Sequence, residues 1–185
     1  MGNSQAHPAF RTIDLTVAVK LAQDLIAIGD SSDVEVNLEI TVPGMPELER
    51  LTTAMPTATM FGYGQSPCTH PPSGSAAASP FPIFLEWRSQ PYGRLEDRFV
   101  AVVGQCPGTL VWSRVRWPAV PSLNLPAEGE YGHVSISINS RHLHWDEPAL
   151  DHTVHIHDRK GSVLRAQWIA EQVGLDLIGP PCVAL

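Results

Sequence analysis

Histidines gather near the carboxyl end of this 185-residue chain. Six of the eight fall between His133 and His157, most densely in "HLHWDE" at 142–147 and "DHTVHIHD" at 151–158. Side chains two positions apart on a strand project from the same face, so an H-x-H pair presents two neighbouring imidazoles. Such a pair can share a metal ion, with a nearby carboxylate completing the ligand set. The spacing therefore predicts a site for a divalent metal such as zinc, with the ligands His142, His144, Asp146, His155 and His157.

Two other interpretations of the histidines fit the same spacing. In "DHTVHIHD", Val154 and Ile156 are expected to face inward, which turns His155 and His157 toward the wetter face of the strand. The histidines then form a polar surface strip, or a group that responds to pH because imidazoles titrate near neutrality. The chemistry of the cluster stays open between these alternatives and a metal site.

Short motifs around the histidines resemble those of two known families. "HVSI" at 133–136 matches the H-Φ-[ST]-Φ signature of two-histidine phosphoesterases, in which two such motifs supply an acid and a base. None of the other seven histidines has Ser or Thr two positions later. "HLHWDE" is similar to the HxHxDH motif of metallo-β-lactamases, but Glu147 stands in place of the last histidine. Neither motif is complete, so the sequence predicts membership of neither family.

A second surface of interest is expected on the strand "TLVWSRVRW" at 109–117. An exposed Trp117 beside Arg114 and Arg116 would form a partner-binding surface, because Trp and Arg dominate binding hot spots. No GxSxG elbow, phosphate-binding P-loop or strand-linked GxGxxG is present, and no catalytic motif is complete. The first expectation is therefore a non-enzymatic accessory or protein-binding domain. The alternative is a metal-binding protein or metal-dependent hydrolase that uses the H-x-H histidines.

Composition narrows the class of protein further. The chain has 12 Lys and Arg residues and 19 Asp and Glu residues, which gives a net charge of −7. Nucleic-acid binding needs clustered cations, and this acidic chain lacks them. There is no run of 18 apolar residues, so a membrane-spanning helix is not expected. Three cysteines without a CxxC pair favour reduced thiols. We expect a soluble, cytoplasmic protein whose partner is another protein rather than a membrane or a nucleic acid.

Hydrophobic periodicity predicts the elements that must position these residues. Asp14 is a plausible N-cap for a helix over 14–28, and residues 34–42 alternate as a half-buried strand. Residues 56–82 contain six prolines and predict a long loop. The remaining expectations are a short helix at 46–55, strands at 82–88, 97–103, 109–117, 131–139 and 152–158, a helix at 162–173 and a short edge strand near the end.

This order of elements predicts the fold class. We expect one α+β domain over 1–185, with an antiparallel β-sheet meander and an N-terminal and a C-terminal helix packed on one face. Residues 1–10 are expected to be a flexible N-terminus.

Overall fold

The architecture is taken from a computed structural model, which describes residues 4–62, 67–68, 81–129, 132–141, 143, 148–158 and 162–184. Four helices form within these residues: α1 (Leu15–Ile26), α2 (Met45–Ala54), α3 (Glu96–Val102) and α4 (Val163–Gln172). The strands are β1 (Ser4–Thr12), β2 (Glu35–Val42), β3 (Thr59–Gly62), β4 (Pro67–Cys68), β5 (Ile83–Pro91), β6 (Gly108–Val115), β7 (Gly132–Ile138), β8 (His152–Asp158) and β9 (Cys182–Ala184).

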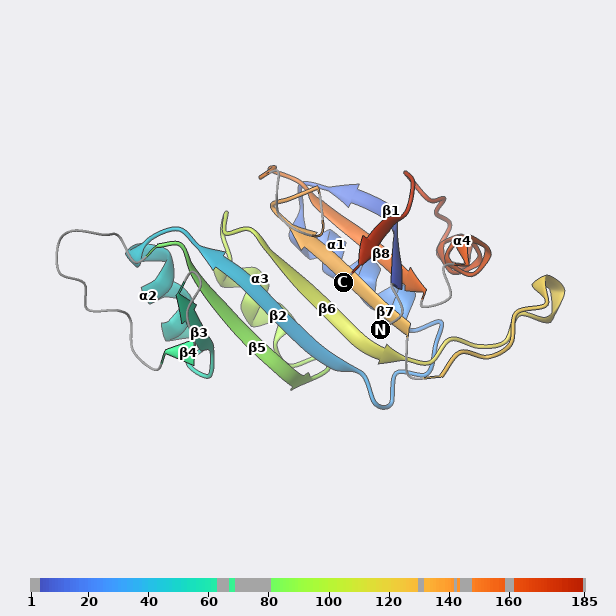
Figure 1. The fold of residues 1–185 in the computed structure, drawn as a ribbon, viewed down its shortest axis with the longest axis horizontal. Coiled ribbons are helices and arrows are strands. Elements are labelled where there is room, and N and C mark those ends of the chain that lie inside the picture. The colour runs from blue at the N-terminus through green and yellow to red at the C-terminus, as the bar shows by residue number, and fades with distance from the viewer. Residues whose placement is uncertain are drawn as a thin grey trace.

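All of these strands belong to one sheet, in the order β4-β3-β5-β2-β6-β7-β8-β1-β9 (Figure 1). Every neighbouring pair is antiparallel. The α+β class and the antiparallel sheet are thus confirmed. The meander is limited to β6, β7 and β8 and to the short pair β3 and β4, because β2 lies between β5 and β6 and β1 lies between β8 and β9.

Local signals explain the elements that were predicted correctly. Asp14 caps α1, since its side chain accepts hydrogen bonds from the backbone N–H groups of Thr16 and Val17. The alternation over 34–42 gives β2, whose Val36, Leu38, Ile40 and Val42 are all buried. Pro46 lies in the first turn of α2, where its missing N–H has no helical partner to lose.

The strand expected over 97–103 is wrong, because these residues form most of α3. The buried Glu96 carboxylate accepts hydrogen bonds from the backbone N–H groups of Gly93 and Leu95 and from Trp112 Nε1. Phe99 is fully buried on the same helix. The place beside β5 that a strand here would take is occupied by β2.

The chain before α1 is also more regular than expected. Residues 1–10 were expected to be flexible, yet Ser4–Thr12 forms β1 and pairs with both β8 and β9. The pairing with β8 shifts register between Pro8 and Phe10. Pro8 has no N–H to donate to a ladder, and such a residue is tolerated in a sheet at an irregularity of this kind.

Part of the loop expected over 56–82 is also strand. Thr59–Gly62 forms β3 and Pro67–Cys68 forms β4, while 63–66 and 69–80 lie outside the described residues. One hydrophobic core runs under the sheet, with α1 against β7 and β8, α4 against β8 and β1, and α2 against β2. No helix in the described part of the chain is long and apolar enough to cross a bilayer.

Candidate functional site

The register of β7 and β8 brings together the polar side chains that the sequence spreads over 25 residues. His133 pairs directly with His157, and Ser135 pairs with His155. The intervening Val134 and Ile156 also pair with each other and are buried in the core beneath the sheet. Because successive side chains alternate between faces, the burial of these apolar residues sets the histidines on the opposite face.

His157 lies at the centre of this group, which we call the histidine cluster (His133, Ser135, His155 and His157). Its ring centroid is 6.1 Å from that of His133 and 6.4 Å from that of His155, and both ring pairs meet edge to face. Ser135 Oγ lies 2.7 Å from His157 Nε2, which is hydrogen-bond distance. The hydroxyl therefore holds one nitrogen of the central imidazole in place.

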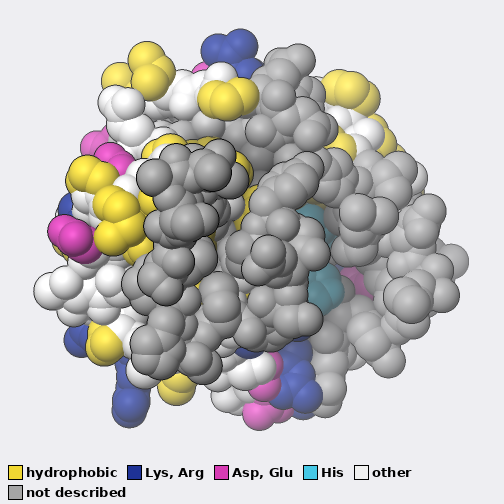
Figure 2. Space-filling view, turned by 60° about the vertical axis from the view of Figure 1, so that its left-hand side comes forward, with side chains coloured by type: hydrophobic (Ala, Val, Ile, Leu, Met, Phe, Trp, Pro, Cys, Tyr) yellow, Lys and Arg dark blue, Asp and Glu magenta, His cyan; other side chains and the backbone are white. Residues whose placement is uncertain are grey.

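The surface-strip interpretation of the histidines is wrong, because the cluster is buried. His155 is 1% exposed and His157 is 7% exposed, and Ser135 is fully buried. The burial extends along the whole of β8, because all seven of its residues are buried. His133 is only partly buried, so the cluster is most open at the His133 end. Figure 2 shows histidine side chains set back in a recess of the surface.

Burial also sets the charge of the cluster. Desolvation lowers the pKa of His133 below its usual value of 6.5. Desolvation lowers the pKa of His157 well below 6.5, and the neighbouring His155, His133 and His7 add to this effect. Both imidazoles are therefore neutral at pH 7, with His157 the harder of the two to protonate.

His7 on β1 is a further buried histidine. It pairs with Ile156, which places its side chain on the core face of the sheet and not on the face of the histidine cluster. Burial lowers its pKa, although the negative charge of Asp158 opposes the shift. Its Nδ1 and Nε2 atoms have no hydrogen-bond partner within the part of the chain that the structure describes. A buried polar group in this state is costly to the stability of the fold.

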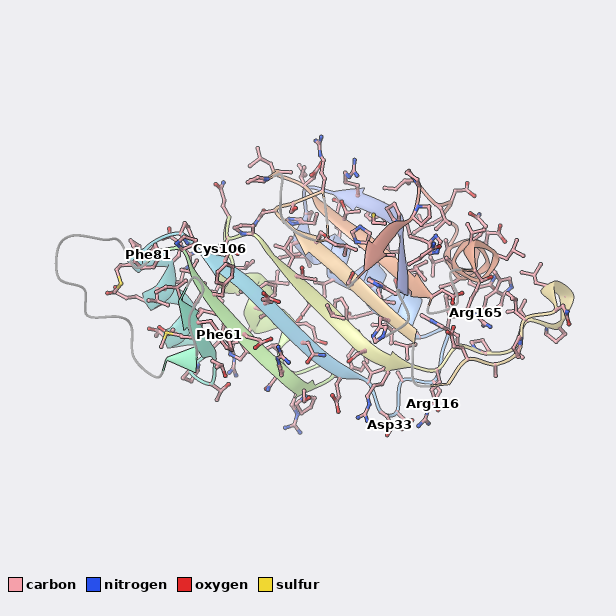
Figure 3. The ribbon with its side chains drawn as sticks, viewed as in Figure 1. Asp33, Phe61, Phe81, Cys106, Arg116 and Arg165 are labelled. Atoms are coloured by element: carbon pink, nitrogen blue, oxygen red, sulfur yellow. The ribbon has the colours of Figure 1, made fainter. Side chains whose placement is uncertain are left out.

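A buried ion-pair group holds the end of β8. Arg165 Nε on α4 lies 3.3 Å from Glu128 Oε2 and 4.0 Å from Asp158 Oδ2. The same guanidinium donates hydrogen bonds to the backbone carbonyls of Pro118 and Pro126. Arg165 thereby ties the connector between β6 and β7 to α4 (Figure 3) and fixes the strand that carries His157.

The structure describes two of the five predicted metal ligands. His155 and His157 are neighbours in the cluster, as their spacing predicted. His142, His144 and Asp146 lie outside the described residues. Among the residues that are described, no group of three His, Cys, Asp or Glu side chains is arranged to hold a metal ion.

The predicted partner-binding residues do not form the exposed surface that was expected. Trp117 is 1% exposed, so it is not the exposed anchor that was expected. Arg114 has φ +68° within a register shift between Trp112 and Val115, and this irregularity turns Trp117 into the core and Arg114 outward. Arg114 Nη1 pairs with Glu35 Oε1 at 2.6 Å, and Arg116 pairs with Asp30 and with Asp33 (Figure 3).

His133 and Ser135 were not among the site residues predicted from the sequence, although both belong to the motif "HVSI", which matches a phosphoesterase signature. Both residues of that motif belong to the cluster, and the second imidazole comes from His157 rather than from a second copy of the motif. Two imidazoles with different pKa values, one of them partly open to solvent, can act as an acid and a base on one substrate when one ring carries a proton and the other does not. Comparison with family models, with curated proteins and with solved structures finds no match to this chain in any of the three.

Proposed function

We propose that the histidine cluster is a catalytic acid–base site and that it hydrolyses phosphodiesters. The observation that carries the proposal is the direct pairing of His133 with His157, whose ring centroids lie 6.1 Å apart. A phosphoryl group between two such rings can exchange a proton with each of them, because acid–base catalysis requires groups within hydrogen-bond reach of the reacting atoms.

The different environments of the two histidines suggest their roles. His157, whose pKa lies well below 6.5, is the base that removes a proton from the attacking water. His133, partly open to solvent, takes up a proton more readily than His157 does. In the fraction of molecules in which His133 is protonated and His157 is neutral, His133 gives this proton to the oxygen that leaves phosphorus. The P–O bond to the leaving group breaks as the bond from water forms. Proton exchange with solvent then restores both imidazoles.

Ser135 is a positioning residue in this proposal. It is fully buried, so its hydroxyl is poorly placed to attack a substrate directly. Its 2.7 Å contact with Nε2 instead fixes the orientation of the His157 ring. The proposal further takes the N-terminal and C-terminal helices to share the face opposite the histidines. The contacts of α1 with β7 and β8, and of α4 with β8, support this arrangement.

The test is hydrolysis of bis(p-nitrophenyl) phosphate by His133→Gln and His157→Gln variants in the presence of a chelator. Loss of a general acid or base is expected to lower kcat/KM by roughly 10²- to 10⁴-fold. His152→Gln is the matched control, because His152 lies on the same strand but bonds to the backbone N–H of Asn139, away from the cluster. Circular dichroism checks that each variant is folded.

Three results would contradict the acid–base proposal. Full activity in His133→Gln would show that the pair does not act together. Activity that disappears with the chelator and returns with zinc would favour the metal-dependent alternative, which also expects bound metal that a His155→Ala, His157→Ala double variant loses. No turnover by the unaltered protein would favour a non-enzymatic, protein-binding domain.

A further inference from the structure

A second concave site lies far along the sheet from the histidine cluster. A cavity of about 300 Å³ opens where the end of α2, the end of β5 and the turn before α3 meet. Its wall includes Met55, Trp87, Gln90, Leu95, Arg94 and Arg98. β5 is separated from β7 by β2 and β6, so this cavity is independent of the proposed catalytic site. The volume is at the lower end of the range for small-molecule sites.

The two arginines of this cavity differ from the other cations. Of the Lys and Arg side chains within the described residues, only Arg94 and Arg98 form no hydrogen bond or ion pair. They lie four positions apart and line the same wall. Like charges that line one cavity disfavour each other. Two uncompensated guanidiniums on one cavity of a chain with net charge −7 therefore point to an anionic ligand.

The indole of Trp87 supplies a further unused donor. Trp87 is 1% exposed, and its Nε1–H has no acceptor in the described part of the chain. A buried donor without an acceptor is rare in folded proteins. Leu95 and Met55, both buried, give the same cavity an apolar wall. The site thus combines cationic donors with a surface that suits an apolar group.

We propose that this cavity binds a small organic phosphate monoester. One arginine saturates a carboxylate through two parallel hydrogen bonds, whereas a phosphate dianion has three terminal oxygens and can accept from two guanidiniums at once. The organic part of the ligand lies against the apolar wall formed by Met55 and Leu95. The volume limits that part to a small ring or a short chain.

Isothermal titration calorimetry with phenyl phosphate tests the proposal, with benzoate and inorganic phosphate as comparison ligands. Phenyl phosphate is expected to bind more tightly than either, because it alone combines the dianion with an apolar ring. An Arg94→Ala, Arg98→Ala double variant is expected to lose at least about tenfold in affinity, since each charge-assisted hydrogen bond contributes substantially to binding. Both side chains are exposed, so these changes leave the core intact.

Arg114→Ala is the matched control, because it removes an exposed arginine from another part of the sheet. Its affinity for phenyl phosphate is expected to equal that of the unaltered protein. The proposal is overturned if phenyl phosphate shows no saturable binding, or if the double variant binds it as well as the control does. Benzoate binding as tightly as phenyl phosphate would overturn the assignment to phosphate.

Discussion

His157 depends on its surroundings for the properties that make it a candidate base. Its burial removes the water that would stabilise an imidazolium, and His133, His155 and His7 stand near enough to disfavour a positive charge further. The contact with Ser135 also holds the neutral imidazole ring of His157 in one orientation. A histidine on an exposed strand would have neither property.

The buried histidines predict how stability depends on pH. The pKa values of His7, His133, His152 and His157 are all lowered by burial, so each binds its proton more weakly in the folded chain than in the unfolded chain. Below about pH 6.5 the unfolded chain takes up more protons, and the free energy of unfolding falls as the pH falls. The slope is up to roughly 1.4 kcal/mol per pH unit for each such histidine.

Urea denaturation at a series of pH values between about 5.5 and 8 measures this slope. The His157→Gln variant should show a shallower dependence than the unaltered protein, because one of the four groups has been removed. A free energy of unfolding that stays constant over this range would show that the histidines are protonated equally in both states.

Gly132, the first residue of β7, lies so close to β6 that there is no room for a side chain at this position. A Cβ atom on Gly132 would come within 2.4 Å of both Trp117 Nε1 and the backbone carbonyl oxygen of Val115. Gly132 is the residue before His133, so its close approach to β6 also sets the position of the candidate acid. A side chain here would push the two strands apart.

Gly132→Ala is therefore expected to lower the free energy of unfolding by about 1–3 kcal/mol, the usual range for overpacking. It should also reduce activity, because His133 moves with the strand. Gly129→Ala is the control, since a Cβ there meets nothing within 4 Å. Thermal unfolding of the two variants in parallel measures the difference, and equal stabilities would contradict the packing argument.

The elements that the sequence predicted well are those with local signals. Asp14 and the apolar stripe of α1 act within one helix, and the alternation of β2 reports one buried face. The segment "DRFVAVV" is rich in residues that favour strands, but its conformation depends on the contact between Glu96 and Trp112, which lie 16 positions apart. The hydrophobic pattern within the segment does not indicate that contact, because Trp112 lies outside the segment.

At the scale of the whole molecule, Arg165 connects parts of the chain that lie far apart in sequence. Its side chain joins α4 to the connector that precedes β7 and to Asp158 at the end of β8. Only about 5% of the side chain is exposed, as is 7% of its partner Glu128. Removing the cation leaves carboxylates buried without the charge that compensates them.

Arg165→Ala is expected to destabilise the protein by about 3–5 kcal/mol, the range for breaking a buried ion pair from one side. Arg141→Ala removes an exposed arginine that pairs with Asp151, and it should cost no more than about 1 kcal/mol. Chemical denaturation of both variants gives the comparison. A small effect of Arg165→Ala would indicate that water reaches the carboxylates.

Sequence alone determined the class of the fold and the type of chemistry available. Alternation in β2, β7 and β8 predicted the strands, and the spacing of His155 and His157 predicted neighbouring imidazoles on one face. Those features follow from the geometry of a single strand, which has a period of two residues.

The tertiary structure decided which strands are neighbours and what they bury. His155 and His157, which were expected on a wet face, are buried in the folded chain, and the register of β7 against β8 set His133 opposite His157. The irregularity at Arg114 moved Trp117 into the core. These outcomes depend on the packing of residues distant in sequence, and such packing leaves no periodic signal within any one segment.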